Sequence, residues 1–203
     1  MYMGRKKNRG APEPRTTASL GCSCARLRLK VARLEREVAL ARRFAYHDPL
    51  TGLPNRSLLL DRLEQALAQA TRQRHKVGVL LLDLDDFKKV NDELGHHAGD
   101  TILRNVAERL LGCLRVCDTA CRYGGDEFVI LLPEVESADQ LDRVKLKIRQ
   151  HLSRPHRLGE RSIVVGGSIG SALFGEGAES CADLIGIADA AMYRAKRGGA
   201  AGS

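Results

Sequence analysis

The feature that most constrains the fold is an alternation of short apolar runs with longer amphipathic stretches. The run KVGVLLLDLDDF (76–87) is typical of a strand that ends in acidic residues. Two further runs, 119–123 and 127–132, flank the letters GGDE and predict a hairpin. The other expected elements are helices over residues 57–73, 87–94, 98–114, 137–152 and 181–197 and a strand over residues 161–174. This order predicts an α+β fold, a mostly antiparallel sheet flanked by helices and preceded by an N-terminal helix.

The N-terminal helix is predicted over residues 20–46, because apolar side chains recur there with alternating spacings of four and three. They are Leu20, Cys24, Leu27, Val31, Leu34, Val38, Ala41 and Ala45. This heptad pattern favours a coiled coil between two chains, although an amphipathic helix that packs on its own domain would also show it. Pro49, Gly52 and Pro54 end the helix. The globular domain is expected over residues 47–203.

The net charge of +8 is concentrated before the globular domain. Residues 1–43 hold 12 Lys and Arg against 3 Asp and Glu, whereas residues 44–203 hold 21 against 22. Only 4% of the residues are aromatic and none is Trp, so a nucleic-acid-binding surface on the domain is not expected. Residues 1–19 are predicted to be a disordered basic tail, with a contact to nucleic acid or anionic lipid as the functional alternative.

The chain is expected to be cytoplasmic. No window approaches 18 apolar residues, which argues against a membrane span, and the basic N-terminus lacks the apolar region of a signal peptide. The six cysteines are therefore expected to be reduced thiols. Cys113, Cys117 and Cys121 are spaced four apart but lack a zinc-type CxxC pair, so apolar filling of the core is favoured over a metal site.

Two acidic clusters suggest a site for a cation. The first cluster is Asp83, Asp85 and Asp86 at the end of the apolar strand, and the second is Asp126 and Glu127 in the hairpin turn. No chemistry is expected of Asp85 and Asp86. If the two strands are neighbours, the carboxylates would repel one another, and a divalent cation such as Mg²⁺ would relieve that conflict. Gly124 and Gly125 would let a phosphate-bearing ligand approach the backbone. Each cluster alone is also explained by capping, solvation or a simple hairpin turn.

Five motifs in order carry a resemblance over about residues 46–198. They are DPLTGLPNR (48–56), DLDDFKKVNDELGHHAGD (83–100), RYGGDEF (122–128), GGSIG (166–170) and DAAMYRAK (189–196). With these motifs the chain resembles the GGDEF family of diguanylate cyclases. The resemblance implies a fold like the palm domain of nucleotidyl cyclases and some polymerases, with an antiparallel sheet between helices.

The resemblance implies roles for the acidic residues. Asp83 and Asp126 would bind Mg²⁺ (or Mn²⁺) through their side chains, with the backbone carbonyl of Leu84 as a further ligand. Glu127 would assist at the metal centre or in activating the 3′-hydroxyl. Together Asp83, Asp126 and Glu127 would form the catalytic group.

The resemblance also implies how GTP would be bound. Asn91 and Asp100 would bind the guanine edge, and an Asp can accept from the N1–H and exocyclic amine that adenine does not present together. Phe87 and Lys88 would hold the β- and γ-phosphates at the start of a helix, and Lys196 would reach the triphosphate. A helix cap at Asn91 and a solvated Lys88 are the structural alternatives.

The activity implied is the condensation of two GTP molecules into cyclic di-GMP with release of two pyrophosphates. One domain would hold one GTP, so the active unit would be a homodimer joined through the N-terminal helix. Arg115 and Asp118 stand at the spacing of the family's inhibitory RxxD site, where product binds, although this short pattern also suits a helix-end salt bridge. Ala200 stands where the family usually has an arginine, which leaves a catalytically weak module that binds GTP or cyclic di-GMP as the alternative function.

Overall fold

The computed structural model describes the backbone of residues 17–200 and the side chains of residues 26–198. The N-terminal helix α1 (Thr17–Tyr46) is continuous and begins three residues earlier than the sequence predicts. The large apolar side chains at its described heptad positions are between 49 and 61% exposed: Leu27, Val31, Leu34 and Val38. Their pairing with a second chain stays a prediction. Most of the predicted basic tail, residues 1–16, lies outside the described residues.

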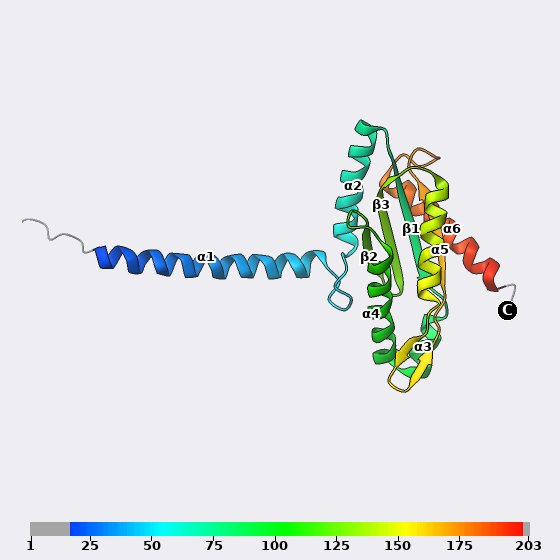
Figure 1. The fold of residues 1–203 in the computed structure, drawn as a ribbon, viewed down its shortest axis with the longest axis horizontal. Coiled ribbons are helices and arrows are strands. Elements are labelled where there is room, and N and C mark those ends of the chain that lie inside the picture. The colour runs from blue at the N-terminus through cyan, green and yellow to red at the C-terminus, as the bar shows by residue number, and fades with distance from the viewer. Residues whose placement is uncertain (1–16, 201–203) are drawn as a thin grey trace, which may run out of the picture. The chain divides into compact units, whose positions relative to one another are not determined.

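The residues from Phe44 onward form a compact unit of their own. Its elements are α2 (Arg56–Gln73), β1 (Lys76–Leu84), α3 (Phe87–Leu94), α4 (His96–Cys113), β2 (Thr119–Gly124), β3 (Glu127–Val135), α5 (Ala138–Leu152), β4 (His156–Leu158), β5 (Arg161–Ile163), β6 (Gly167–Leu173) and α6 (Cys181–Ala200). Four strands form one sheet in the order β2-β3-β1-β6, and every neighbouring pair is antiparallel (Figure 1). The predicted α+β fold class is confirmed.

The strand β1 lies inside the sheet and is buried on both faces. Leu80 and Leu82 belong to a core formed with α4 and α5, whereas Val79 and Leu81 belong to a second core formed with α2 and α6. Successive side chains of a strand point to opposite faces, so a strand covered by helices on both sides needs apolar residues throughout. This explains the continuous apolar run that precedes Asp83.

The segment expected as one strand over residues 161–174 is two strands in different sheets. β5 pairs with β4 in a separate two-stranded sheet, while β6 pairs with β1. Between them, the Gly166 carbonyl accepts a hydrogen bond from the Asp85 N–H at 3.0 Å. The run changes partners there, and β4 was not expected at all. An apolar run does not show which neighbour each part of it pairs with, so this prediction was wrong.

The cysteine prediction holds for two of the three closely spaced thiols. Cys113 and Cys121 are buried, and burial raises the pKa of Cys121 to about 12, so this thiol stays protonated. Cys117 is exposed, and the expectation that it fills the core is wrong. None of the helices in the described residues combines the length and the hydropathy that a membrane span requires.

Candidate functional site

The pairing of β1 with β3 brings the two acidic clusters together. Asp83 lies opposite Glu127 in the antiparallel register, and the Leu84 N–H donates to the Asp126 carbonyl at 3.4 Å. The end of β1 and the turn between β2 and β3 are therefore neighbours, as the site expected from the sequence requires. From α6, Lys196 Nζ donates to Asp83 Oδ1 at 2.5 Å. Four predicted side chains thus meet at one edge of the sheet.

The acidic groups at this edge disfavour one another's charge. Burial, and then the Asp83 carboxylate, raise the pKa of Asp126. Burial, followed by the charges of Asp83, Asp126 and Asp189, raises the pKa of Glu127. The hydrogen bond to Asp83 raises the pKa of Lys196, so this ammonium stays charged and supplies positive charge at the edge. A further cation here would be stabilised by the same field.

The donor set suits a magnesium ion that is shared with a ligand. In the described residues, no three His, Cys, Asp or Glu side chains converge closely enough to hold a metal ion by themselves. Mg²⁺ commonly takes one or two carboxylates and completes its octahedron with phosphate oxygens and water. The carboxylate of Asp83 and the carbonyl of Leu84 lie at the end of β1, and the carboxylate of Asp126 lies in the turn before β3. All three are hard oxygen donors, and they fit this mode.

A cavity of about 480 Å³ lies beside the acidic edge. It is lined by Phe87, Lys88, Asn91, Asp92, His96, Asp100, Leu103, Arg122, Gly125 and Asp126. Four residues of α3 and α4 that were expected to bind GTP thus line one cavity, together with Gly125 and Asp126 of the turn: Phe87, Lys88, Asn91 and Asp100. Gly124 lines a neighbouring cavity instead. Asp83, Glu127 and Lys196 are outside the lining of the larger cavity.

The start of α3 presents backbone donors near this cavity. The residue before the helix, Asp86, has a φ of +54°, which is uncommon for a residue with a side chain, and its side chain does not cap the helix. The N–H groups of a helix's first turn have no partner within the helix, so Phe87 and Lys88 can offer theirs to an anion.

The position of Asn91 depends on a glycine in the next helix. A Cβ on Gly99 would collide with Asn91 Oδ1. The bond at the end of α3 runs from the Gly95 N–H to the Asn91 backbone carbonyl at 2.9 Å. The Asn91 side chain forms no hydrogen bond with any other described residue. Asn91 therefore does not cap a helix with its side-chain amide, which was the structural alternative.

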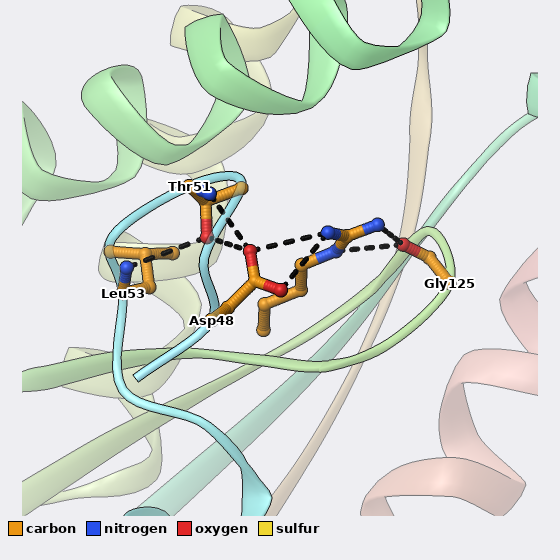
Figure 2. Close-up of polar contacts among 5 residues, drawn as sticks. Asp48, Thr51, Leu53 and Gly125 are labelled. Atoms are coloured by element: carbon orange, nitrogen blue, oxygen red, sulfur yellow. Dashed lines mark hydrogen bonds and ion pairs between the residues drawn. The ribbon is translucent and has the colours of Figure 1, made fainter. Parts of the chain in front are cut away.

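Arg122 and Asp48 form an ion pair beside the turn, and no role was expected for either residue. Arg122 Nη1 lies 3.2 and 3.1 Å from the two carboxylate oxygens of Asp48, while Nε and Nη2 donate to the Gly125 carbonyl at 3.0 and 2.8 Å (Figure 2). Asp48 and Arg122 belong to two different motifs of the five, and their opposite charges were the only indication in the sequence that they could pair. The sequence does not show which of its many charged residues pair with each other.

The RxxD residues close a turn between α4 and β2. Asp118 Oδ2 accepts from the Arg115 backbone N–H at 2.9 Å, and the Asp118 N–H donates to the Arg115 carbonyl at 3.1 Å. Among the described residues, no side chain pairs with the Arg115 guanidinium. The salt bridge offered as the structural alternative is therefore not formed.

Comparison with known proteins shows the family to which the chain belongs. The family model described as "Diguanylate cyclase, GGDEF domain" matches residues 45–201. Two proteins of Pseudomonas aeruginosa are each 45% identical: the bifunctional diguanylate cyclase/cyclic di-GMP phosphodiesterase MucR over 170 residues and the diguanylate cyclase TpbB over 167. The matches cover 84 and 82% of this chain, but only 24% of MucR and 38% of TpbB. The chain thus spans less than half the length of these relatives.

A solved structure is similar over a longer part of the chain. The coiled coil and GGDEF domain of DgcB from Caulobacter crescentus, in complex with c-di-GMP, is 34% identical with a TM-score of 0.81. The match covers 89% of this chain and 96% of that chain. From the family model and these relatives, the chain belongs to the diguanylate cyclase, GGDEF domain family.

Proposed function

We propose that the chain is a diguanylate cyclase that condenses two GTP molecules into cyclic di-GMP and releases two pyrophosphates. The observation that carries the proposal is that Asp83 lies opposite Glu127 of β3 and next to the turn that holds Asp126, beside a cavity lined by Asn91 and Asp100. This arrangement offers carboxylates for a metal-bound triphosphate and amide and carboxylate groups for a base. The relatives named as diguanylate cyclases support the same activity.

The cavity offers partners for each part of GTP. The Asp100 carboxylate accepts from guanine N1–H and the exocyclic amine, and the Asn91 amide bonds N3 and the same amine. The uncapped start of α3, with Phe87 and Lys88, receives the β- and γ-phosphates. Lys196 reaches the triphosphate from α6, once it exchanges its partner Asp83 for a phosphate oxygen. Gly124 and Gly125 leave the backbone of the turn open to the ligand.

The acidic edge would hold Mg²⁺ (or Mn²⁺) through Asp83, Asp126 and the Leu84 carbonyl. When bound, such an ion offsets negative charge on the phosphoryl oxygens and makes a nearby hydroxyl more acidic. Glu127 assists at this centre or takes the proton of the 3′-hydroxyl. Its raised pKa suits the second role, because a base works best when its pKa approaches the working pH.

The reaction needs two copies of the domain. The 3′-oxygen of each GTP attacks the α-phosphorus of the other, and the bond from that phosphorus to pyrophosphate breaks. One domain holds one GTP, so two domains must face each other about a two-fold axis. The exposed heptad positions of α1 support a homodimer joined through this helix. Consumption of GTP fits the cytoplasmic location that the sequence predicts.

The RxxD turn would bind the product and inhibit the enzyme. Asp118 is fixed by the backbone of Arg115, which leaves the Arg115 guanidinium to pair with a phosphate or a guanine edge. The alternative function is a module that binds GTP or cyclic di-GMP without turnover, and Ala200, in place of the family's usual arginine, favours it.

The deciding experiment incubates the purified full chain with GTP and Mg²⁺ and separates the nucleotides by chromatography, with Asp126→Ala beside it. We expect cyclic di-GMP from the wild type and none from the variant. No product from the wild type, even when two chains are fused into a dimer, would overturn the proposal. Calorimetry with GTP and with cyclic di-GMP would then show which ligand the module binds.

A further inference from the structure

We propose that Arg122 is a positioning residue: anchored by Asp48, its guanidinium holds the Gly125 carbonyl and so fixes the turn that carries Asp126. The inference rests on the proposed function, because the turn matters only if it presents Asp126 to a nucleotide. It concerns a residue pair for which the sequence suggested no role.

The Arg122 guanidinium is nearly saturated by the protein itself. A guanidinium has five N–H donors, and four contacts of Arg122 reach Asp48 and Gly125 at 2.8 to 3.2 Å. The Arg122 and Asp48 side chains are only 16 and 17% exposed, so water weakens this ion pair little. Although Arg122 lines the cavity, it has little capacity left to bind a phosphate directly.

The turn needs such a restraint because it consists of Gly125 and Asp126 and directly follows a second glycine, Gly124, the last residue of β2. Gly125 has a φ of +52°, and the pairing of β2 with β3 shifts register between Arg122 and Gly124. Glycine loses more conformational freedom on folding than any other residue, so this glycine pair without further contacts samples many shapes. Two charge-assisted hydrogen bonds to one carbonyl select a single shape of the turn.

The anchor is itself held in place by the segment that follows α1. Asp48 Oδ1 accepts from the Thr51 N–H at 2.8 Å and from the Thr51 hydroxyl at 2.6 Å (Figure 2). Although burial opposes ionisation, these bonds and Arg122 hold the pKa of Asp48 below its ordinary value, so it stays a carboxylate. The Arg122 N–H also donates to the Pro54 carbonyl at 3.0 Å. Both ends of Arg122 are thus tied to one segment.

That segment is tied in turn to the last residues of α1. The Asn55 N–H donates to the Tyr46 carbonyl at 2.9 Å, and Asn55 Nδ2 donates to the Ala45 carbonyl at 2.8 Å. Hydrogen bonds therefore run without a break from the end of α1 through residues 47–55 to the Gly125 carbonyl. The shape of the catalytic turn depends on a segment about 70 residues away in the sequence.

The test measures hydrogen exchange at residues 123–127 of the full chain without nucleotide, in Arg122→Gln, Asp48→Asn and the double variant. We expect exchange about tenfold faster or more in each single variant, and the double variant to exchange no faster than Arg122→Gln. The matched control is Glu176→Gln, which removes an exposed ion pair with Lys76 and should leave the turn unchanged. Additive effects in the double variant, or exchange as in the wild type, would overturn the inference.

A second measurement separates positioning from loss of the fold. Arg122→Lys keeps a positive charge near Asp48 but lacks the fork that reaches both partners, so it should melt as the wild type does and exchange at an intermediate rate. The KM for GTP should rise about tenfold in Arg122→Gln, because fewer turns are competent to bind. A folded Arg122→Lys with wild-type exchange and an unchanged KM in Arg122→Gln would refute the role. If the wild type makes no product, the proposed function fails, while the exchange result still stands.

Discussion

Lys196 Nζ lies 2.5 Å from Asp83 Oδ1, although 113 residues separate them in the sequence. The pair joins α6 to the end of β1 and places an ammonium on a proposed metal ligand. A lysine at this oxygen competes with any other cation for it.

Lys196→Met should therefore change metal and nucleotide binding in opposite directions. We expect the affinity for Mn²⁺ alone to rise about fivefold, because one competing charge is removed, and the affinity for GTP to fall about tenfold. Titration followed by electron paramagnetic resonance measures free Mn²⁺, and calorimetry measures GTP. The control is Arg194→Met, an exposed residue of the same helix. Unchanged Mn²⁺ affinity in Lys196→Met would show that the ion pair does not compete.

Asp126→Asn should stabilise the protein in the absence of nucleotide and metal. The pKa of Asp126 is raised, so at pH 7 the ionised carboxyl lowers the free energy of unfolding, and an amide removes that cost. We expect the melting temperature to rise by about 2 °C at pH 7. The difference should shrink as pH falls toward the ordinary value of 3.8, because the wild-type carboxyl then protonates.

The control for this prediction is Asp61→Asn, an exposed carboxylate on α2. Melting curves with Mg²⁺ and GTP should reverse the order, since only the wild type binds them well. A melting temperature that falls in Asp126→Asn without ligands would contradict the expectation.

His156 should make the protein sensitive to acid. It is fully buried and accepts from Arg109 Nη1 at 2.9 Å, and burial with the Arg109 charge lowers its pKa from 6.5 to about 4. The unfolded chain therefore binds more protons between these values, so stability is lost as pH falls from 6.5 to 4. This residue alone should remove about 3 kcal/mol between pH 7 and pH 4.

Urea unfolding across this pH range checks the prediction. His156→Asn stays neutral and still offers Arg109 an oxygen, so its stability should depend less on pH than that of the wild type. His97→Asn replaces an exposed histidine and should keep the wild-type pH dependence. Parallel curves for wild type and His156→Asn would contradict the assignment.

A charge at the heptad seam of α1 should separate the proposed dimer. Leu34→Lys places an ammonium at an exposed seam position, whereas Ala32→Lys places the same charge off the seam. Light scattering should show a monomer for the first and a dimer for the second, and cyclic di-GMP formation per chain should fall at least about tenfold only in the first. Equal mass and activity in both variants would argue against pairing through α1.

Arg115→Ala should relieve product inhibition without slowing the first turnovers. The guanidinium lies on the RxxD turn, and the Arg115 backbone bonds that hold Asp118 remain in the variant. Progress curves with added cyclic di-GMP should stay linear at product concentrations that stop the wild type. Identical inhibition of both proteins would remove Arg115 from the product site.

The local pattern of the sequence was sufficient for most elements. The helix α3 has the predicted bounds, and β1 begins at the residue where its apolar run begins. Both elements could be predicted because the periodicity of a helix and the apolar run of a buried strand are patterns of neighbouring residues. The acidic edge was expected only on the condition that the apolar strand and the hairpin are neighbours, and the pairing of β1 with β3 meets that condition. The division of residues 161–174 between two sheets could not be predicted, because the sequence of an apolar run does not show which strand it pairs with.

The fold class, the family and six of the residues that line the larger cavity could be predicted from the sequence, since these depend on local periodicity and ordered motifs. The pairing of Lys196 with Asp83 and the contacts by which Arg122 joins Asp48 to Gly125 follow from the folded arrangement of distant segments. Many charged residues along the chain could form such pairs. The packing of α6 and of residues 47–55 determines which charged side chains come within hydrogen-bond distance of each other. These residues are too far apart in the sequence for a short-range pattern to show that they pair.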